Sequence, residues 1–502
     1  MFWADRIAGE ILERFGKSRP IAIRDEKTLS GRVHIGSMRG VAIHDTVAHA
    51  LERQGAPVTW RYELNDFDVM DSVPPMLCEE TFSPYLGMLL RDVPSPDSSA
   101  ANFAEYFAND FKSAIAHAGF MPEFYWGSEA YLSGAMDGVI RDALERADRI
   151  RAIYKEVSGS TKKEGWLPIA VVCPQCRKIA TTVANDFDGE TVMVNCYKTA
   201  VDYTEGCGFE GRVSPFGGAA KLPWKVEWPA KWKVQGVMVE GAGKDHSTKG
   251  GARDVANHIS KEIFNYEPPF DIPYEFFLVG GKKMSSSKGR GSSSREIADL
   301  LPTKIFRLMM LGKDINQQVN FDPEGDTIPV LYDLYDKLSA GYALDKTDDY
   351  ARLYEAIHMN ALPEGASLPR FSQVAFVVQM PHMDIYKEFP DADKAELDER
   401  AMYAKKWLEA YAPEKYVFKL QEAMPTVALS DVQRQTLRDL LVFLEANPAA
   451  GAEDIHKKLH ESKEFKAIYH IFLNKDHGPK AGWFLAALPR DFVLKRLREA
   501  IA

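Results

Sequence analysis

An alternation of strand and helix patterns in residues 20–64 limits the N-terminal part of this chain to an α/β fold. A short apolar run at 21–23 predicts a buried strand. After a glycine-containing loop, apolar residues recur every four positions over 43–51, as on the buried face of a helix. Residues 58–64 then alternate between apolar and polar, which predicts a second strand. Strand, loop, helix and strand form a βαβ unit, so we expect a Rossmann-like domain with a parallel sheet.

The rest of the chain divides into regions of different character. At about 100–200 residues per domain, 502 residues predict more than one domain. We expect residues 1–300 to form the α/β domain, interrupted by an insertion at about 160–220 that holds four of the five cysteines. Val237–Val239 and Phe276–Val279 are the strands expected to complete the sheet after this insertion. Long amphipathic segments predict that 301–502 is an all-α region.

Composition narrows the class of protein. Hydrophobic residues make up 45% and charged residues 27%, which excludes a mainly disordered chain. No run of about 18 apolar residues is present, so we expect no membrane span. The opening segment contains Asp5 and Glu10 and predicts an amphipathic helix rather than a signal peptide. Five cysteines make no disulfide framework, which favours the reducing cytoplasm. The net charge of −10 argues against a polyanionic partner, except at the locally basic segment 281–290.

The loop 28–40 lies between the first predicted strand and helix, where α/β sheets bind ligands. Gly31 and Gly36 allow close approach of a backbone to a ligand, and His34 offers a hydrogen-bond donor. A phosphate is favoured at the N-terminus of the helix that follows. On the loop alone, a histidine packed for structural reasons is the favoured interpretation.

The segment KKMSSSKG (282–289) follows an apolar strand pattern and combines lysines with three serines. Lys283 and Lys288 each supply a positive charge, and serine hydroxyls add hydrogen bonds to an anion. The pattern indicates a phosphate-binding loop. A flexible basic surface loop is the alternative.

Four cysteines of the insertion form a candidate metal site. Cys173 and Cys176 make a C-x-x-C pair, and Cys196 and Cys207 follow. Four cysteines in a reducing compartment predict a structural Zn²⁺ ion. The alternative is that the thiols hold no metal. The remaining Cys78 fits neither interpretation and is expected to be a small buried residue.

The two loops together are similar to the paired signature motifs of class I aminoacyl-tRNA synthetases: HIGS at 34–37 and KMSSSKG at 283–289. Further segments resemble one family of that class, the class I lysyl-tRNA synthetases. These segments are KLPWKVEWPAKW (221–232), VEGAGKDHSTKGGARD (239–254), FDPEGDTIPVLYDLYDKL (321–338) and HGPKAGWF (477–484). The similarity extends over nearly the whole chain.

This resemblance implies a set of residues that bind ATP, which arrives with Mg²⁺. His34, Lys283 and Lys288 would act as catalytic residues on the phosphates. The further ATP-binding residues would be Gly31, Gly36, Ser37, Gly243, Asp245, Ser285 and Ser287. Within this set, the GKDH motif containing Gly243 and Asp245 would meet the ribose.

The resemblance also implies a lysine pocket. Its residues would be Thr28, Trp224, Trp228, His246 and Asp66. The indoles would pack along the methylenes of the substrate, and a carboxylate or an aromatic face would meet its ammonium. Core packing of the tryptophans and a turn or capping role for the aspartate are the alternatives. Glu26 is a departure, because many members of the family have glycine there.

The implied function is ATP-dependent ligation of lysine to tRNA(Lys) through a lysyl-adenylate, with 301–502 contacting the anticodon. The basic C-terminus (Lys495, Arg496 and Arg498) is one candidate contact surface, and a solvated helix face is the alternative. Two rival functions remain: the same chemistry with another amino acid, such as glutamate, and a non-catalytic tRNA-binding paralogue. The sequence does not give the oligomeric state.

Overall fold

The computed structural model describes residues 1–283, 293–358, 368–381 and 383–502. The chain forms two compact units. The first comprises Met1–Phe321 with Thr347–Asn360, and the second comprises Asp322–Lys346 with Ala361–Ala502. Within the described ranges, no helix is both long enough and apolar enough to cross a membrane.

The first unit is built on a five-stranded parallel sheet, which confirms the predicted α/β class. The strand order is β10-β9-β1-β2-β3. β1 and β2 pair in register from Ile21 opposite Val58 to Thr28 opposite Asn65. The strands are β1 (Ile21–Thr28), β2 (Val58–Asn65), β3 (Glu123–Trp126), β9 (Val239–Gly243) and β10 (Phe270–Tyr274).

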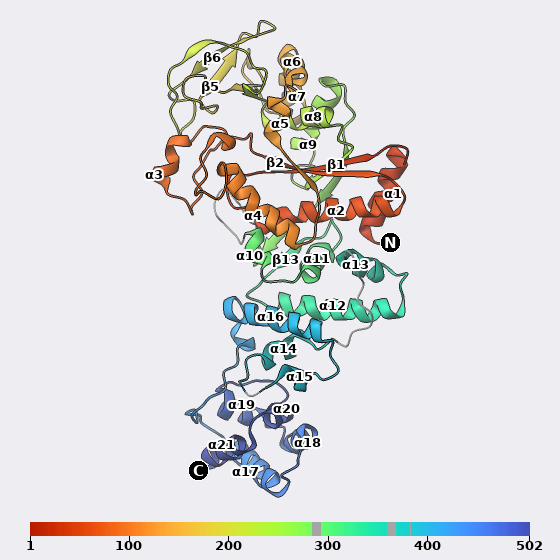
Figure 1. Cartoon of the computed structure of the whole chain (residues 1–502), viewed down its shortest axis with the longest axis vertical. Helices are drawn as coiled ribbons and strands as arrows, with labels where there is room; N and C mark the ends of the chain where they lie inside the picture. The colour runs from red at the N-terminus through yellow and green to blue at the C-terminus, as the bar shows by residue number, and fades with distance from the viewer. Residues whose placement is uncertain (284–292, 359–367, 382) are drawn as a thin grey trace. The chain divides into compact units, whose positions relative to one another are not determined.

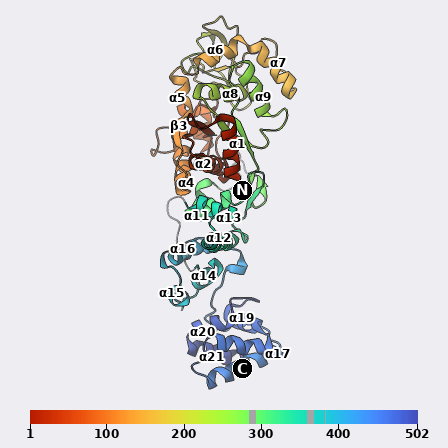
Figure 2. The same cartoon turned by 90° about the vertical axis from the view of Figure 1, so that its right-hand side faces the viewer.

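Helices cover both faces of this sheet. In Figures 1 and 2, α1, α2 and α4 lie on one side of β1 and β2, and α8 and α9 lie on the other. The predicted opening helix and the helix after the glycine loop are confirmed as α1 and α2. The helices of this unit are α1 (Trp3–Phe15), α2 (Met38–Arg53), α3 (Glu79–Phe82), α4 (Phe103–His117), α5 (Gly127–Leu132), α6 (Asp137–Glu145), α7 (Ala147–Ser158), α8 (Trp224–Gln235), α9 (Ala252–Glu262), α10 (Ser294–Ala298), α11 (Thr303–Leu311) and α13 (Asp349–Ile357).

The insertion folds as two small antiparallel sheets. One pairs β4 with β8, and the other has the order β5-β6-β7. In Figure 1 the labels β5 and β6 mark this yellow-green part of the chain. Its strands are β4 (Ala170–Val171), β5 (Thr182–Asn185), β6 (Val192–Cys196), β7 (Glu210–Val213) and β8 (Ala220–Lys221).

One strand assignment from the sequence is wrong. The apolar run 276–279 forms β11 (Phe277–Val279), which belongs to a separate sheet with β12 (Lys282–Lys283) and β13 (Val319–Phe321). The edge of the main sheet is instead β10, whose polar and proline residues conceal the strand pattern. β10 pairs with β9 along its whole length, from Phe270 opposite Val239 to Tyr274 opposite Gly243. This pairing stabilises β10 as a strand, although its own sequence has little strand preference.

The second unit is helical in its described residues, as predicted. Leucine and aromatic side chains from five of its helices, α17 to α21, form a buried core with residues of α14. Its helices are α12 (Thr327–Leu344), α14 (Phe371–Val377), α15 (Ile385–Glu388), α16 (Lys394–Ala410), α17 (Asp431–Ala446), α18 (Ala452–Ser462), α19 (Phe465–Leu473), α20 (Ala481–Ala487) and α21 (Arg490–Ile501).

Arg496 does not fit the predicted basic contact surface. Its side chain is 1% exposed and its guanidinium donates to the carbonyl oxygens of Ile471, Gln421 and Glu422. This arginine therefore links segments of the helical core. Lys495 and Arg498 are exposed, and Arg498 pairs with Glu445.

Candidate active site

A cavity of about 310 Å³ opens at the carboxyl ends of β1, β9 and β10. This is the edge of a parallel sheet at which α/β proteins bind ligands. Six of the residues predicted from the sequence line it: Thr28, Ser37, Trp224, Trp228, Gly243 and His246. They come from four separate parts of the chain, so the fold brings together both the lysine and the ATP candidates.

Two indoles and an imidazole form one wall of the cavity. Trp224 and Trp228, one turn apart on α8, stack with their ring centroids 5.7 Å apart. The ring of His246 lies edge-on to Trp224 at 5.3 Å. Trp224 is 42% exposed, whereas Trp228 is 5% exposed. An exposed indole stacked on a buried one presents a flat apolar surface to the aliphatic part of a ligand.

The chain that follows the KMSSSKG motif meets the HIGS loop at an isolated β-bridge. His34 pairs with Ser293, and the amide of Ser294 donates to the carbonyl of Val33 at 2.8 Å. The KMSSSKG motif begins at Lys283 in β12, and the described chain resumes at Ser293 beside the HIGS loop. Ser285, Ser287 and Lys288 lie outside the described residues.

The remaining predicted residues lie elsewhere in the unit. Gly36 belongs to the single 3₁₀ turn before α2, and Gly31 is buried in the preceding loop. Asp245 follows β9, close enough that a Cβ on Gly243 would lie 2.9 Å from its carboxylate. Asp66 is not among the residues that line the described cavity. Its carboxylate accepts from the amide and hydroxyl of Ser128, at 2.8 and 2.7 Å.

A buried network of charges lies against the cavity. Arg24 is 2% exposed and pairs with Glu63 at 2.7 Å and with Glu240 at 2.5 Å. Lys231, on α8, is 1% exposed and pairs with Oε1 of Glu63, whereas Arg24 pairs with Oε2. Burial alone would raise the pKa of Glu63, but Arg24 and Lys231 hold that pKa well below its usual range. Glu63 is therefore a buried carboxylate, and its charge depends on two cations.

Sequence reasoning missed several residues that line the cavity, among them Asp25, Glu240 and Tyr274. Asp25 faces His44 at 3.3 Å, and the carboxylate of Glu240 accepts from Trp228 Nε1 at 2.9 Å. Their positions in the sequence could have identified them as candidates. Each stands in a strand of the parallel sheet, which helices cover on both faces, so a charged or phenolic side chain there needs a specific partner.

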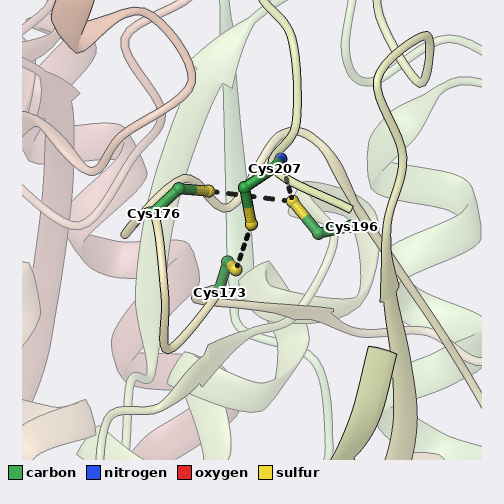
Figure 3. A group of neighbouring side chains, drawn as sticks. All are labelled: Cys173, Cys176, Cys196 and Cys207. Atoms are coloured by element: carbon green, nitrogen blue, oxygen red, sulfur yellow. Dashed lines mark hydrogen bonds between the residues drawn. The ribbon is translucent and has the colours of Figure 1, made fainter. Parts of the chain in front are cut away.

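The four cysteines of the insertion lie together, as Figure 3 shows. Cys173 Sγ is 3.6 Å from Cys207 Sγ, Cys176 Sγ is 3.7 Å from Cys196 Sγ, and all four sulfurs lie within 4.8 Å of one another. A tetrahedral ion with metal–sulfur distances of about 2.3 Å holds its sulfurs about 3.8 Å apart. The cluster therefore fits a metal ion bound by four thiolates.

The surroundings shift the thiol pKa values of the cluster in opposite directions, because burial raises the pKa of Cys173 to about 12 and also raises that of Cys176. Burial acts to raise the pKa of Cys196, but hydrogen bonds with Thr181 Oγ1 and from the amide of Cys207 lower it to about 7. Gly206 lets the backbone pass close to this sulfur. A Cβ there would lie 2.8 Å from Cys196 Sγ and 2.4 Å from the carbonyl oxygen of Tyr197.

Comparison with known proteins places this site in a family. Residues 1–361 match the family described as tRNA synthetases class I (K). The lysine–tRNA ligase of Methanosarcina barkeri is 33% identical, with 99% of this chain and 97% of that protein aligned. The lysine–tRNA ligase of Pyrococcus horikoshii is 32% identical, with 99% of each aligned. A glutamate tRNA ligase structure from Elizabethkingia meningosepticum covers 96% of this chain at 14% identity, with a TM-score of 0.43. The match over more than two thirds of the chain, together with relatives above 30% identity over its whole length, shows that this chain belongs to the class I (K) family of tRNA synthetases.

Proposed function

We propose that this protein ligates lysine to tRNA(Lys) in two steps. The carboxylate of lysine attacks the α-phosphorus of ATP, which gives lysyl-adenylate and pyrophosphate. A terminal ribose hydroxyl of the tRNA then attacks the carbonyl of the adenylate and releases AMP. Neither step needs a nucleophile from the protein, so catalysis rests on positioning and on stabilisation of charge. Mg²⁺ bound with ATP would neutralise part of the phosphate charge.

We assign the parts of the cavity by their chemistry. Ser37 and Gly243 would lie along the nucleotide, and His34, Lys283 and Lys288 would hold its phosphates. Trp224 and Trp228 would pack along the four methylenes of lysine, with His246 and Thr28 beside them. The β-bridge between His34 and Ser293 supports this assignment, because it holds the residues that follow the KMSSSKG motif beside the loop that precedes α2.

The acidic lining of the cavity is the observation on which the choice of lysine rests. Three carboxylates, those of Asp25, Glu26 and Glu240, and one ammonium, that of Lys27, line the cavity, and Glu26 is the carboxylate with acceptor capacity left for a ligand. A glutamate side chain there would meet carboxylates of its own sign, whereas the ammonium of lysine would meet opposite charge. The relatives named as lysine–tRNA ligases support the same choice. The helical second unit would contact the anticodon of the tRNA.

Amino-acid-dependent exchange between ATP and pyrophosphate tests the proposal. The assay covers all twenty amino acids, with and without total tRNA, because tRNA can be required before activation. We expect exchange with lysine only. Exchange with another amino acid would refute the choice of substrate. A folded protein that binds ATP and supports no exchange would favour the non-catalytic paralogue.

We further propose that the metal of the cysteine cluster is Zn²⁺ with a structural role. The purified protein is then expected to contain about one zinc ion per chain. Cys176→Ser should lower the zinc content and the temperature at which the insertion unfolds, measured by metal analysis and calorimetry. Cys78→Ser is the matched control, since Cys78 is exposed and lies outside the cluster. Equal zinc content in the two variants would contradict the assignment.

A further inference from the structure

Most carboxylates of the buried network next to the cavity already have their hydrogen bonds. Glu240 accepts from Arg24 and from the indole nitrogens of Trp228 and Trp232. Glu63 accepts from Arg24, Tyr125 and Lys231. Glu227 accepts from Tyr131 and Lys221. A ligand ammonium would therefore have to displace an internal donor at each of these three residues.

Glu26 differs from the other members of the network. It is a cavity-lining residue whose side chain is 21% exposed, whereas the side chains of Glu63, Glu227 and Glu240 are at most 3% exposed. Its Oε2 pairs with Arg24 and lies 3.7 Å from Lys231. Among the residues of the described ranges, none hydrogen-bonds to its Oε1. Glu26 thus lines the cavity with a carboxylate that Arg24 holds through Oε2 and that retains acceptor capacity on Oε1.

The charge balance of this cluster favours one more cation. Arg24, Lys221 and Lys231 are paired with four carboxylates, namely Glu26, Glu63, Glu227 and Glu240. One negative charge is left over, and it remains when Lys27 and Asp25, which also line the cavity and carry opposite charges, are added to the count. Asp68 is not counted, because it is 35% exposed and reaches solvent. In a largely buried cluster such an excess is costly unless a cation from outside completes it.

We infer that Glu26 accepts the side-chain ammonium of the amino acid substrate and so sets the preference for lysine. The inference rests on the proposed function and names the specificity residue of that same site. Trp228 hydrogen-bonds Glu240, which shares Arg24 with Glu26, so the indole wall and this carboxylate belong to one connected structure. A lysine whose stem follows the indoles would end with its ammonium at Glu26.

The electrostatics around Glu26 agree with this role. Burial raises the pKa of Glu26, and the nearby charges of Arg24 and Lys231 only partly offset the effect. A bound ammonium would supply the missing favourable interaction with the ionised form. Asp25, the other partly exposed carboxylate of the wall, accepts from the amide of Glu26 at 2.7 Å and faces His44. It lies on the opposite face of β1, towards α2, because adjacent strand residues alternate.

The test is Glu26→Gln, which removes the charge and keeps the shape. Exchange is measured with tRNA present, using lysine and norleucine, which has the same carbon chain without the ammonium. We expect the KM for lysine to rise about 10- to 100-fold, as for loss of a charged hydrogen bond. Discrimination between lysine and norleucine should fall by a similar factor, and the KM for ATP should stay unchanged.

Two further variants complete the test, one as a control and one as a substitute in case Glu26→Gln does not fold. Glu123→Gln is the matched control, because this glutamate lies on β3 with its side chain 64% exposed, and it should change neither constant. Glu26→Asp retains the charge but withdraws it by one methylene, so its KM for lysine should rise less than that of Glu26→Gln. This variant provides the test if Glu26→Gln fails to fold in a thermal unfolding assay.

The outcomes separate the two proposals. A wild-type protein that activates lysine, with a folded Glu26→Gln variant of unchanged lysine KM and discrimination, would overturn the inference alone. If Glu26→Gln is unfolded, an unchanged lysine KM in Glu26→Asp would overturn it equally. A wild-type protein without lysine-dependent exchange would overturn the proposed function and this inference with it.

Discussion

Replacing Lys231 with methionine is expected to lower the free energy of unfolding by about 3–5 kcal/mol. Methionine is close to lysine in length and leaves the packing of α8 largely filled. It removes the ammonium that bonds Glu63, whose side chain is 0% exposed, and that lies 3.5 Å from Glu227. The cost comes from carboxylates left buried with too few cations rather than from lost apolar contacts.

Urea denaturation of wild type and variant measures this difference. Lys233→Met is the matched control, since Lys233 stands on the same helix, is 40% exposed and pairs with Asp142 at 3.3 Å. That exposed pair should contribute less than about 1 kcal/mol. Equal destabilisation by the two substitutions would contradict the role given to Lys231.

The loss of unfolding free energy caused by Lys231→Met should be larger at neutral pH than at acidic pH. The folded-state pKa of Glu63 is depressed, so its ion pairs contribute fully above the unfolded carboxyl pKa of about 4.3 and less as pH falls below it. In the variant, protonation of Glu63 relieves the unpaired charge. The difference in unfolding free energy between wild type and variant should therefore be larger at pH 7 than at pH 4.

Replacing Lys288 with alanine is expected to lower kcat for lysine activation about 10²–10³-fold, the usual effect of removing one preorganised charge contact. In the proposed mechanism, this ammonium meets negative charge that develops on the departing pyrophosphate. The KM for lysine should change little, because the cavity walls that would hold lysine come from other segments. Pyrophosphate exchange at saturating lysine and ATP measures the effect.

Lys282→Ala is the control for Lys288, because Lys282 belongs to the same basic segment and is exposed in β12. Its loss should leave kcat within about twofold of wild type, as expected for a solvated surface charge. If both substitutions reduce kcat equally, the segment acts through its overall charge, and the specific role of Lys288 is wrong.

Local patterns in the sequence were sufficient for the α/β class, the helical second unit and the clustering of the four cysteines. Periodicity predicted β1, α2 and β2, because each has an apolar face long enough to detect. It failed at β10, where partner β9 rather than local sequence determines the strand. The resemblance to the synthetase family implied that Trp224 and His246 belong to one pocket, and in the structure their rings are in contact.

The charged network next to the cavity could not be predicted from the sequence. Arg24 and Glu240 are separated by 216 residues, and Lys231 and Glu63 by 168. Each residue alone resembles an ordinary surface charge, and only the packing of α8 on the sheet makes them partners. Asp66 illustrates the converse case. Its position after a strand was compatible with a ligand role and with a turn or capping role, and the fold places Ser128 against its carboxylate.

Direct charging of tRNA tests the central claim most closely. The purified protein is incubated with ATP, Mg²⁺ and a tRNA(Lys) transcript, with lysine or glutamate in separate reactions. Nuclease digestion and mass spectrometry then identify the aminoacyl ester on the terminal adenosine. We expect lysyl-adenosine from lysine and no ester from glutamate. A glutamyl ester, or no ester with either amino acid from a folded protein, would contradict the assignment of this chain as a lysine–tRNA ligase.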